Sequence, residues 1–62
     1  MTGTVVEFDA DVGLGVVATD RDRYRFHCIE IADGSRNIAV GTAVTFELLA
    51  KLGRYEAANI RS

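Results

Sequence analysis

Two neighbouring side chains in the middle of the chain, His27 and Cys28, are of types that carry out chemistry. A nucleophilic cysteine needs a base such as histidine within hydrogen-bond reach. The alternating segment that holds them predicts a β-strand, in which neighbours point to opposite faces, so without a bulge the two cannot act as a pair. One histidine and one cysteine also fall short of the three or four ligands of a zinc site. We therefore expect no enzyme activity and no bound metal.

A second candidate stretch runs from Asp9 to Gly15. Asp9, Asp11 and Gly13 resemble the start of a calcium-binding loop, but the other acidic ligands are missing at the required spacing. Gly13 and Gly15 lack the third glycine and the following helix of a dinucleotide-binding turn. The stretch predicts a solvated turn, no cofactor and no small-molecule substrate.

The composition is that of one small globular domain spanning residues 1–62. Hydrophobic residues make up 48% of the chain and charged residues 26%, which are ordinary globular values. No apolar run approaches the roughly 20 residues of a membrane-spanning helix. The first residues lack the basic and apolar segments of a signal peptide, and a single cysteine permits no internal disulfide. We expect a cytoplasmic protein that does not bind membranes.

The formal net charge is −2, which by itself disfavours a polyanionic partner. The two signs are separated along the chain. Before Arg21 every charged side chain is acidic, and all the basic side chains come at or after that position. A nucleic-acid surface would therefore draw its positive charge from the later strands.

Five short segments have the alternation and composition of β-strands. They are Thr2 to about Phe8, Leu14 to about Thr19, Tyr24–Cys28, Thr42–Leu49, and about Arg54 to Ile60. Glycine at positions 13 and 15 indicates a bend or a close backbone approach at the start of the second segment. One helical turn is expected over residues 29–33, ended by Gly34. Five strands joined by polar turns predict an all-β protein that forms a small closed or nearly closed barrel.

Alternation also assigns side chains to faces. In the segment Tyr24–Cys28 the aromatic side chains are predicted to face the core, while Arg25 and His27 share the opposite face. In the last strand, Ala58 and Ile60 are the predicted inward residues.

Read in order, several motifs resemble the cold-shock domain family: Gly3-Thr4-Val5, Phe8-Asp9, Gly13-Leu14-Gly15-Val16-Val17, Phe26-His27, Gly41-Thr42-Ala43-Val44-Thr45-Phe46-Glu47 and Ala57-Ala58-Asn59-Ile60. The resemblance covers almost the whole chain. It implies a five-stranded antiparallel oligonucleotide-binding (OB-fold) barrel. It also implies binding of single-stranded RNA and DNA, in the manner of an RNA chaperone.

The chain departs from the family on the surface where bases stack. The family pattern Lys-Gly-Phe-Gly-Phe-Ile is Val12-Gly13-Leu14-Gly15-Val16-Val17 here, and Lys-Trp-Phe is Val6-Glu7-Phe8. Arg25 replaces a surface aromatic of the second motif, and His27 is kept. Each base–aromatic stack is worth about 1–3 kcal/mol, so losing several removes on the order of 5 kcal/mol of binding free energy. The resemblance thus implies weak, salt-sensitive binding.

Carried over to this chain, the resemblance implies a nucleic-acid site made of Phe8, Leu14, Val16, Arg25, His27, Arg36 and Arg54. A guanidinium at position 25 stacks on bases and pairs with phosphate, and the imidazole of His27 stacks or hydrogen-bonds. Arg36 and Arg54 are expected in loops beside the binding face. The alternative for the basic residues is a merely solvated surface.

The aliphatic replacements suggest a second function from another class. Leu14 and Val16, with Val6 and Leu49, are predicted to form an apolar strip on the surface. Exposed strips of this kind often mark a protein interface. The alternative function is therefore that of a barrel that does not bind nucleic acid. Such a barrel uses this strip, or a strand edge, to bind a protein partner or a second copy of itself.

Overall fold

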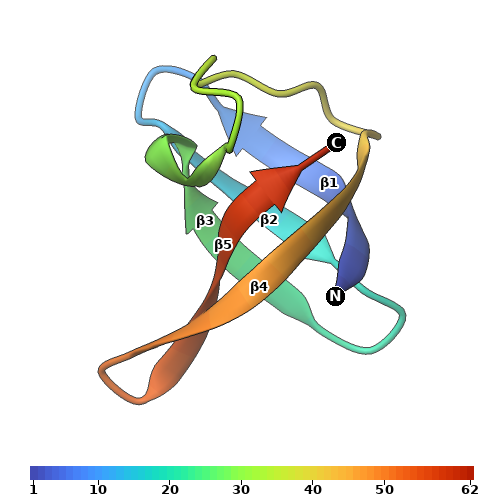
Figure 1. The fold of residues 1–62 in the computed structure, drawn as a ribbon, viewed down its shortest axis with the longest axis vertical. Helices are drawn as coiled ribbons and strands as arrows, with labels where there is room; N and C mark the ends of the chain where they lie inside the picture. The colour runs from blue at the N-terminus through green and yellow to red at the C-terminus, as the bar shows by residue number, and fades with distance from the viewer.

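The computed structural model describes residues 1–62 as one antiparallel sheet with a single short helical turn (Figure 1). Its elements are β1 (Thr2–Asp9), β2 (Leu14–Ala18), β3 (Arg23–His27), η1 (Cys28–Glu30), β4 (Ala43–Lys51) and β5 (Arg54–Arg61). The strand order is β3-β2-β1-β4-β5. The prediction of an all-β protein with five strands is confirmed, and each strand lies within two residues of its predicted bounds. The helical turn comes earlier than predicted and is a 3₁₀ turn.

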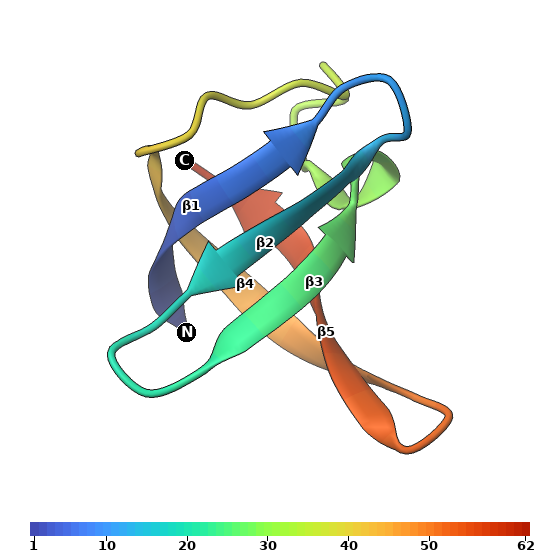
Figure 2. The same cartoon turned by 180° about the vertical axis from the view of Figure 1, so that it is seen from behind.

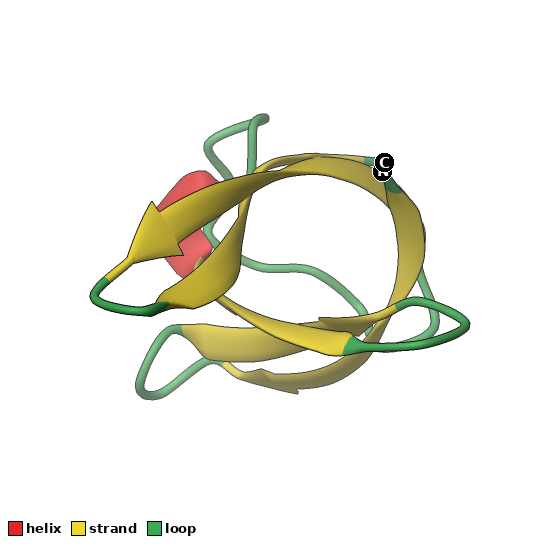
Figure 3. Ribbon diagram, turned by 90° about the horizontal axis from the view of Figure 1, so that it is seen from below, coloured by secondary structure: helices red, strands yellow, loops and turns green.

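The sheet curls round on itself and encloses the core (Figure 3). Its two end strands, β3 and β5, are in contact without forming a hydrogen-bonded ladder, so hydrogen bonds do not close the sheet. The segment after η1 bonds to β5 instead, where the N–H of Ala32 donates to the Ile60 carbonyl oxygen at 2.8 Å. No helix in the structure is long and apolar enough to cross a bilayer.

Eight buried apolar side chains form the core: Val5, Val17, Phe26, Ile31, Val44, Phe46, Ala57 and Ile60. Phe8, Tyr24, Cys28 and Ile38 are half-buried and pack against it. In β3 the side chain of Phe26 is fully buried, whereas Arg25 and His27 are exposed. The prediction that alternation separates a core face from an outer face in this strand is confirmed.

A bulge in β5 overturns the prediction for Ala58. Thr45 of β4 lies opposite Arg61, but Glu47 lies opposite Ala58, so β5 holds one extra residue. Asn59 is the bulged residue, and its backbone lies in the left-handed region with a φ of 52°. As a result Ala57 and Ile60 are the buried pair, and Ala58 is only half-buried. The prediction was wrong because strict alternation holds only in a regular strand, and a bulge breaks the period of two.

Asn59 accepts a hydrogen bond from Nε of Arg61 at 3.4 Å and donates two more that hold the bulge to other elements. Its Nδ2 donates to Oε2 of Glu47 at 2.8 Å, and its backbone N–H donates to Oε1 of Glu30 at 3.3 Å. Asparagine tolerates the left-handed region better than other residues that carry a Cβ.

We expect Asn59→Ala to lower the free energy of unfolding by about 1–2 kcal/mol, because it adds backbone strain and removes the amide donor. Asn59→Gly removes the same donor but adds no backbone strain. Its free energy of unfolding should therefore be about 1 kcal/mol higher than that of Asn59→Ala. Urea unfolding followed by circular dichroism measures both. Equal stability of the alanine and glycine variants would show that the backbone at this position is not strained.

A second bulge lies in β1. Val5 is opposite Val17, but Glu7 is opposite Val16, so Val6 is the extra residue. Because of this shift, Val5 points into the core while Glu7 points outward, although the two are separated by a single residue.

Candidate binding face

Strands β1, β2 and β3 present their outward side chains in two rows. Glu7, Val16 and Arg25 lie opposite one another in the first row. Asp9, Leu14 and His27 do so in the second. We call these six residues the outer face. Each strand contributes one kind of side chain to it: carboxylates from β1, aliphatic groups from β2, and a guanidinium and an imidazole from β3.

The row between these two points inward and supports the outer face from below. It consists of Phe8, Gly15 and Phe26, again directly opposite one another. The rings of Phe8 and Phe26 stack with their centroids 6.0 Å apart and an angle of 11° between their planes. A Cβ on Gly15 would lie 2.4 Å from Cζ of Phe26, so only glycine leaves room for this ring. Of the two alternatives that the sequence left open, a bend or a close backbone approach, the close approach is found at Gly15, where a Cβ would also lie 2.8 Å from the carbonyl oxygen of Glu7.

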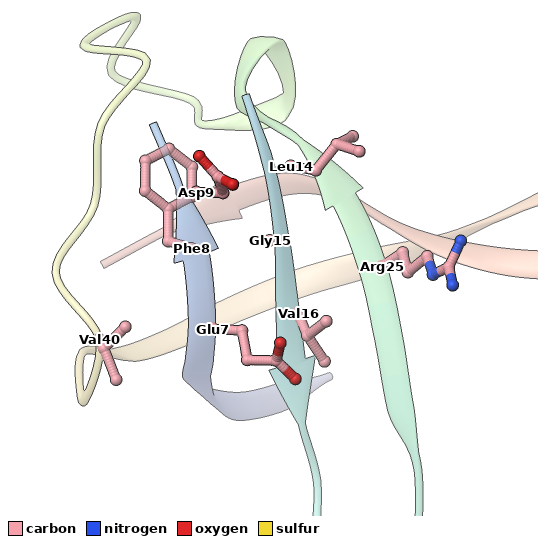
Figure 4. A pocket seen from close by; sticks show the side chains of 8 residues that line it. All are labelled: Glu7, Phe8, Asp9, Leu14, Gly15, Val16, Arg25 and Val40. Atoms are coloured by element: carbon pink, nitrogen blue, oxygen red, sulfur yellow. The ribbon is translucent and has the colours of Figure 1, made fainter. Parts of the chain in front are cut away.

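An open groove of about 490 Å³ runs over the outer face (Figure 4). It is lined by Glu7, Phe8, Asp9, Leu14, Gly15, Val16, Arg25 and Val40. Val40 belongs to the loop before β4 and stands on the opposite side of the groove from Arg25 in Figure 4. The groove thus has an apolar floor, with carboxylates that project from β1 and a guanidinium that projects from β3.

The structure brings together four of the seven predicted site residues. Leu14 pairs directly with His27, and Val16 pairs directly with Arg25. Leu14 is 41% exposed, which leaves its side chain available for contact. These four residues form two adjacent cross-strand pairs on one exposed surface.

The other three predicted residues are placed differently. Phe8 belongs to the inner row and reaches the groove from beneath, with its ring packed on Phe26. Arg36 lies in the loop after η1, and Arg54 lies opposite Lys51 at the end of the β4–β5 hairpin, which projects from the body of the sheet (Figure 2). Neither arginine lines the groove.

The proposed apolar strip is shorter than the sequence predicted. Leu49 lies opposite Glu56 on the β4–β5 hairpin rather than beside Leu14, and Val6 is the bulged residue of β1. Four residues that line the groove were not among the predicted site residues: Glu7, Asp9, Gly15 and Val40. Strand alternation could have placed Asp9 on the outer side of its strand, because its neighbour Phe8 points inward. Val40 lies in a loop, where no periodic pattern predicts the direction of a side chain.

Charge is divided across the outer face by strand. On the same side as Arg25, Arg23 lies opposite Ala18 and places its Nη1 4.0 Å from Oε2 of Glu7. Both of these side chains are mostly exposed, so the ion pair contributes little to stability. Arg25 makes no ion pair within its chain. A phosphate is therefore attracted to β3 and repelled from β1.

Two side chains away from the outer face have a shifted pKa. Partial burial of its ring raises the pKa of Tyr24, and the nearby Asp22 carboxylate adds to the effect. Hydrogen bonds from Ser35, the first from its backbone N–H at 2.9 Å, lower the pKa of Asp33. No group of three or more His, Cys, Asp or Glu side chains gathers closely enough to hold a metal ion.

Comparison of the chain with protein-family models found no match, and comparison with curated proteins found none.

Proposed function

We propose that this chain is a cold-shock-like OB barrel that binds single-stranded RNA or DNA weakly and with little sequence preference, as an RNA chaperone does. The observation that carries the proposal is the gathering of Leu14, Val16, Arg25 and His27 on one exposed face, in two adjacent cross-strand pairs. Aliphatic and cationic groups side by side can contact bases and phosphates at once.

The strand arrangement supports the OB part of the proposal. Strand β1 pairs with both β2 and β4, and β3 meets β5 at the open side of the curled sheet. A five-stranded, partly open barrel that uses strands 2 and 3 for oligonucleotides has the same general form.

In this proposal bases rest on the aliphatic side chains of β2 while phosphates follow the basic side chains of β3. Leu14 and Val16 offer apolar contact without the ring faces that make base stacking strong. Arg25 is exposed and forms no ion pair within the chain, so we assign it as the main phosphate contact. Glu7 and Asp9 keep the backbone of the nucleic acid away from β1.

The direct test is a fluorescence anisotropy titration with a short pyrimidine oligonucleotide at several salt concentrations. Two or three phosphate contacts predict that log K falls with log salt with a slope of about −1.4 to −2.1, because each contact in a single strand contributes about −0.7. Absence of binding at protein concentrations near a millimolar would overturn the proposal. Binding without any dependence on salt would overturn the phosphate contacts.

We expect Arg25→Ala to weaken oligonucleotide binding about three- to tenfold, because it removes a phosphate contact from the face. Lys51→Ala is the matched control. Its Nζ lies 3.4 Å from Oε1 of Glu56 at the far end of the β4–β5 hairpin, and removing it should change the affinity by less than about twofold. The same titration at low salt measures both variants. Equal losses for the two would assign the binding to net charge rather than to the outer face.

A further inference from the structure

The outer face is divided by charge along β2. Glu7 and Asp9 project from β1 on one side of this strand, and Arg25 and His27 project from β3 on the other, each opposite its row partner. The Glu7 carboxylate reaches across β2 to an exposed ion pair with Arg23 at 4.0 Å. The aliphatic side chains of Leu14 and Val16 occupy the line between them. A face with this pattern is complementary to a copy of itself that has been turned over about that line.

We propose that the outer face is a docking surface for a second copy of this chain, with the two faces packed together around a two-fold axis parallel to β2. This rotation lays β1 of each copy over β3 of the other and keeps the rows aligned. Glu7 then exchanges its exposed ion pair with Arg23 of its own chain for the partner's Arg25, and Asp9 meets the partner's His27. Leu14 and Val16 pack on the same residues of the partner.

The charges select this axis from the alternatives. A two-fold axis in the plane of contact but perpendicular to β2 would lay β1 over β1. Glu7 and Asp9 would then face carboxylates, and Arg25 would face the partner's β3. Since like charges facing each other across an interface are strongly unfavourable, only the axis along β2 gives a self-complementary contact.

The lengths of the side chains suit two faces that curve away from each other. Packed sheets lie about 10 Å apart, a distance that apolar side chains from both sides fill at the centre. The three strands belong to a sheet whose backbone curls round on itself (Figure 3), so two such sheets diverge over β1 and β3. The long side chains of Glu7 and Arg25 stand where that gap must be bridged. In Figure 4 the guanidinium of Arg25 extends away from Glu7 of its own chain, which leaves it free for a partner.

The small size of the face sets the strength of the contact. Three strands spaced about 4.8 Å apart give a face only about 15 Å wide. Such a face is much smaller than the roughly 800 Å² per partner that stable complexes bury, so the dimer is weak and depends on concentration. The dimer and an oligonucleotide use the same surface and exclude each other. Oligonucleotide therefore shifts the chain to the monomer by mass action.

Reciprocal charge reversal tests the proposed contact. Glu7→Arg places arginine against the partner's Arg25, and Arg25→Glu places glutamate against the partner's Glu7. Each variant alone should self-associate at least about tenfold more weakly than the original chain. An equimolar mixture restores opposite charges at both contacts of the mixed dimer, so we expect its affinity to return to within about threefold of the original.

Amide chemical shifts measured from about 0.05 to 2 mM protein report self-association of each chain. Titration of isotope-labelled Glu7→Arg with unlabelled Arg25→Glu reports the mixed dimer, with shifts expected in β1, β2 and β3. The matched control is the pair Asp20→Arg and Arg21→Glu, which makes the same changes of charge in the exposed turn between β2 and β3. Each control variant should self-associate like the original chain, and their mixture should gain nothing.

Several results would overturn the dimer. The dimer is contradicted if the chemical shifts of the original chain do not depend on concentration, or if each single variant self-associates as strongly as the original chain. It is also contradicted if the mixed variants associate no more strongly than each variant alone, or if the control mixture gains as much affinity as the test mixture. The dimer does not rest on nucleic-acid binding, and the same variants separate the two. Glu7→Arg should strengthen oligonucleotide binding while it weakens self-association, because it removes a carboxylate beside the phosphate path.

Discussion

Replacing Leu14 and Val16 together by phenylalanine should raise the affinity for a short pyrimidine oligonucleotide by about 30- to 1000-fold. The two side chains come from the same strand and point outward, in rows separated by Gly15. Each new ring adds a base stack that contributes about 1–3 kcal/mol of binding free energy. The smaller contribution of the present aliphatic side chain is lost and has to be subtracted. A net gain of about 2–4 kcal/mol for two rings gives the stated range.

The measurement is the anisotropy titration at fixed low salt, with protein added to a trace of labelled oligonucleotide. Leu49→Phe is the matched control, because Leu49 is 42% exposed against 41% for Leu14 but lies on the β4–β5 hairpin. The control should leave the affinity within about twofold of the original, since its ring is remote from the basic side chains of β3. Equal gains from the control and the double variant would show that the outer face is not the binding surface.

Gly15→Ala should lower the free energy of unfolding by about 3 kcal/mol or more, enough to leave a domain of this size largely unfolded. The added Cβ would lie 2.4 Å from Cζ and 2.6 Å from Cε1 of Phe26, and 2.8 Å from the carbonyl oxygen of Glu7. Phe26 is fully buried and stacked on Phe8, so its ring cannot move aside without disturbing the core. The carbonyl is part of the β1 backbone and has no freedom of its own.

Gly34→Ala separates this clash from the general effect of replacing a glycine. Gly34 has a φ of 76°, and no atom lies within 4 Å of the place that a Cβ would take, so alanine there adds only backbone strain of about 1 kcal/mol. Urea unfolding monitored by circular dichroism compares the two variants. If Gly15→Ala is as stable as Gly34→Ala, the inner row has room to adjust and the close approach is not essential to the fold.

Much of the fold was predictable because strand alternation is a local property. The period of two assigned Phe26 to the core and Arg25 and His27 to the surface, and all three assignments are confirmed. The same reasoning was wrong at Ala58, because the bulge at Asn59 shifts the register by one residue. Propensity gives no warning of such a bulge, since its position depends on how β4 and β5 pair.

The candidate site was predictable to the extent that it follows β2 and β3. Leu14, Val16, Arg25 and His27 each fall on the outer side of a regular strand, and pairing of these two strands brings them together. The position of Glu7 beside Val16 depends on the bulge at Val6, which strict alternation does not predict. Loop residues such as Arg36 carry no periodic signal, so their distance from the face required the structure.

The alternation of inner and outer rows on the same three strands also makes this small chain a scaffold for new binding specificities. None of the six outer-face side chains belongs to the buried cluster, while Phe8, Gly15 and Phe26 support the strands from the other side. A library randomised at the six surface positions alone would keep every packing contact of the interior. Selection from such a library could then yield domains for ligands unrelated to nucleic acid, all built on one unchanged framework.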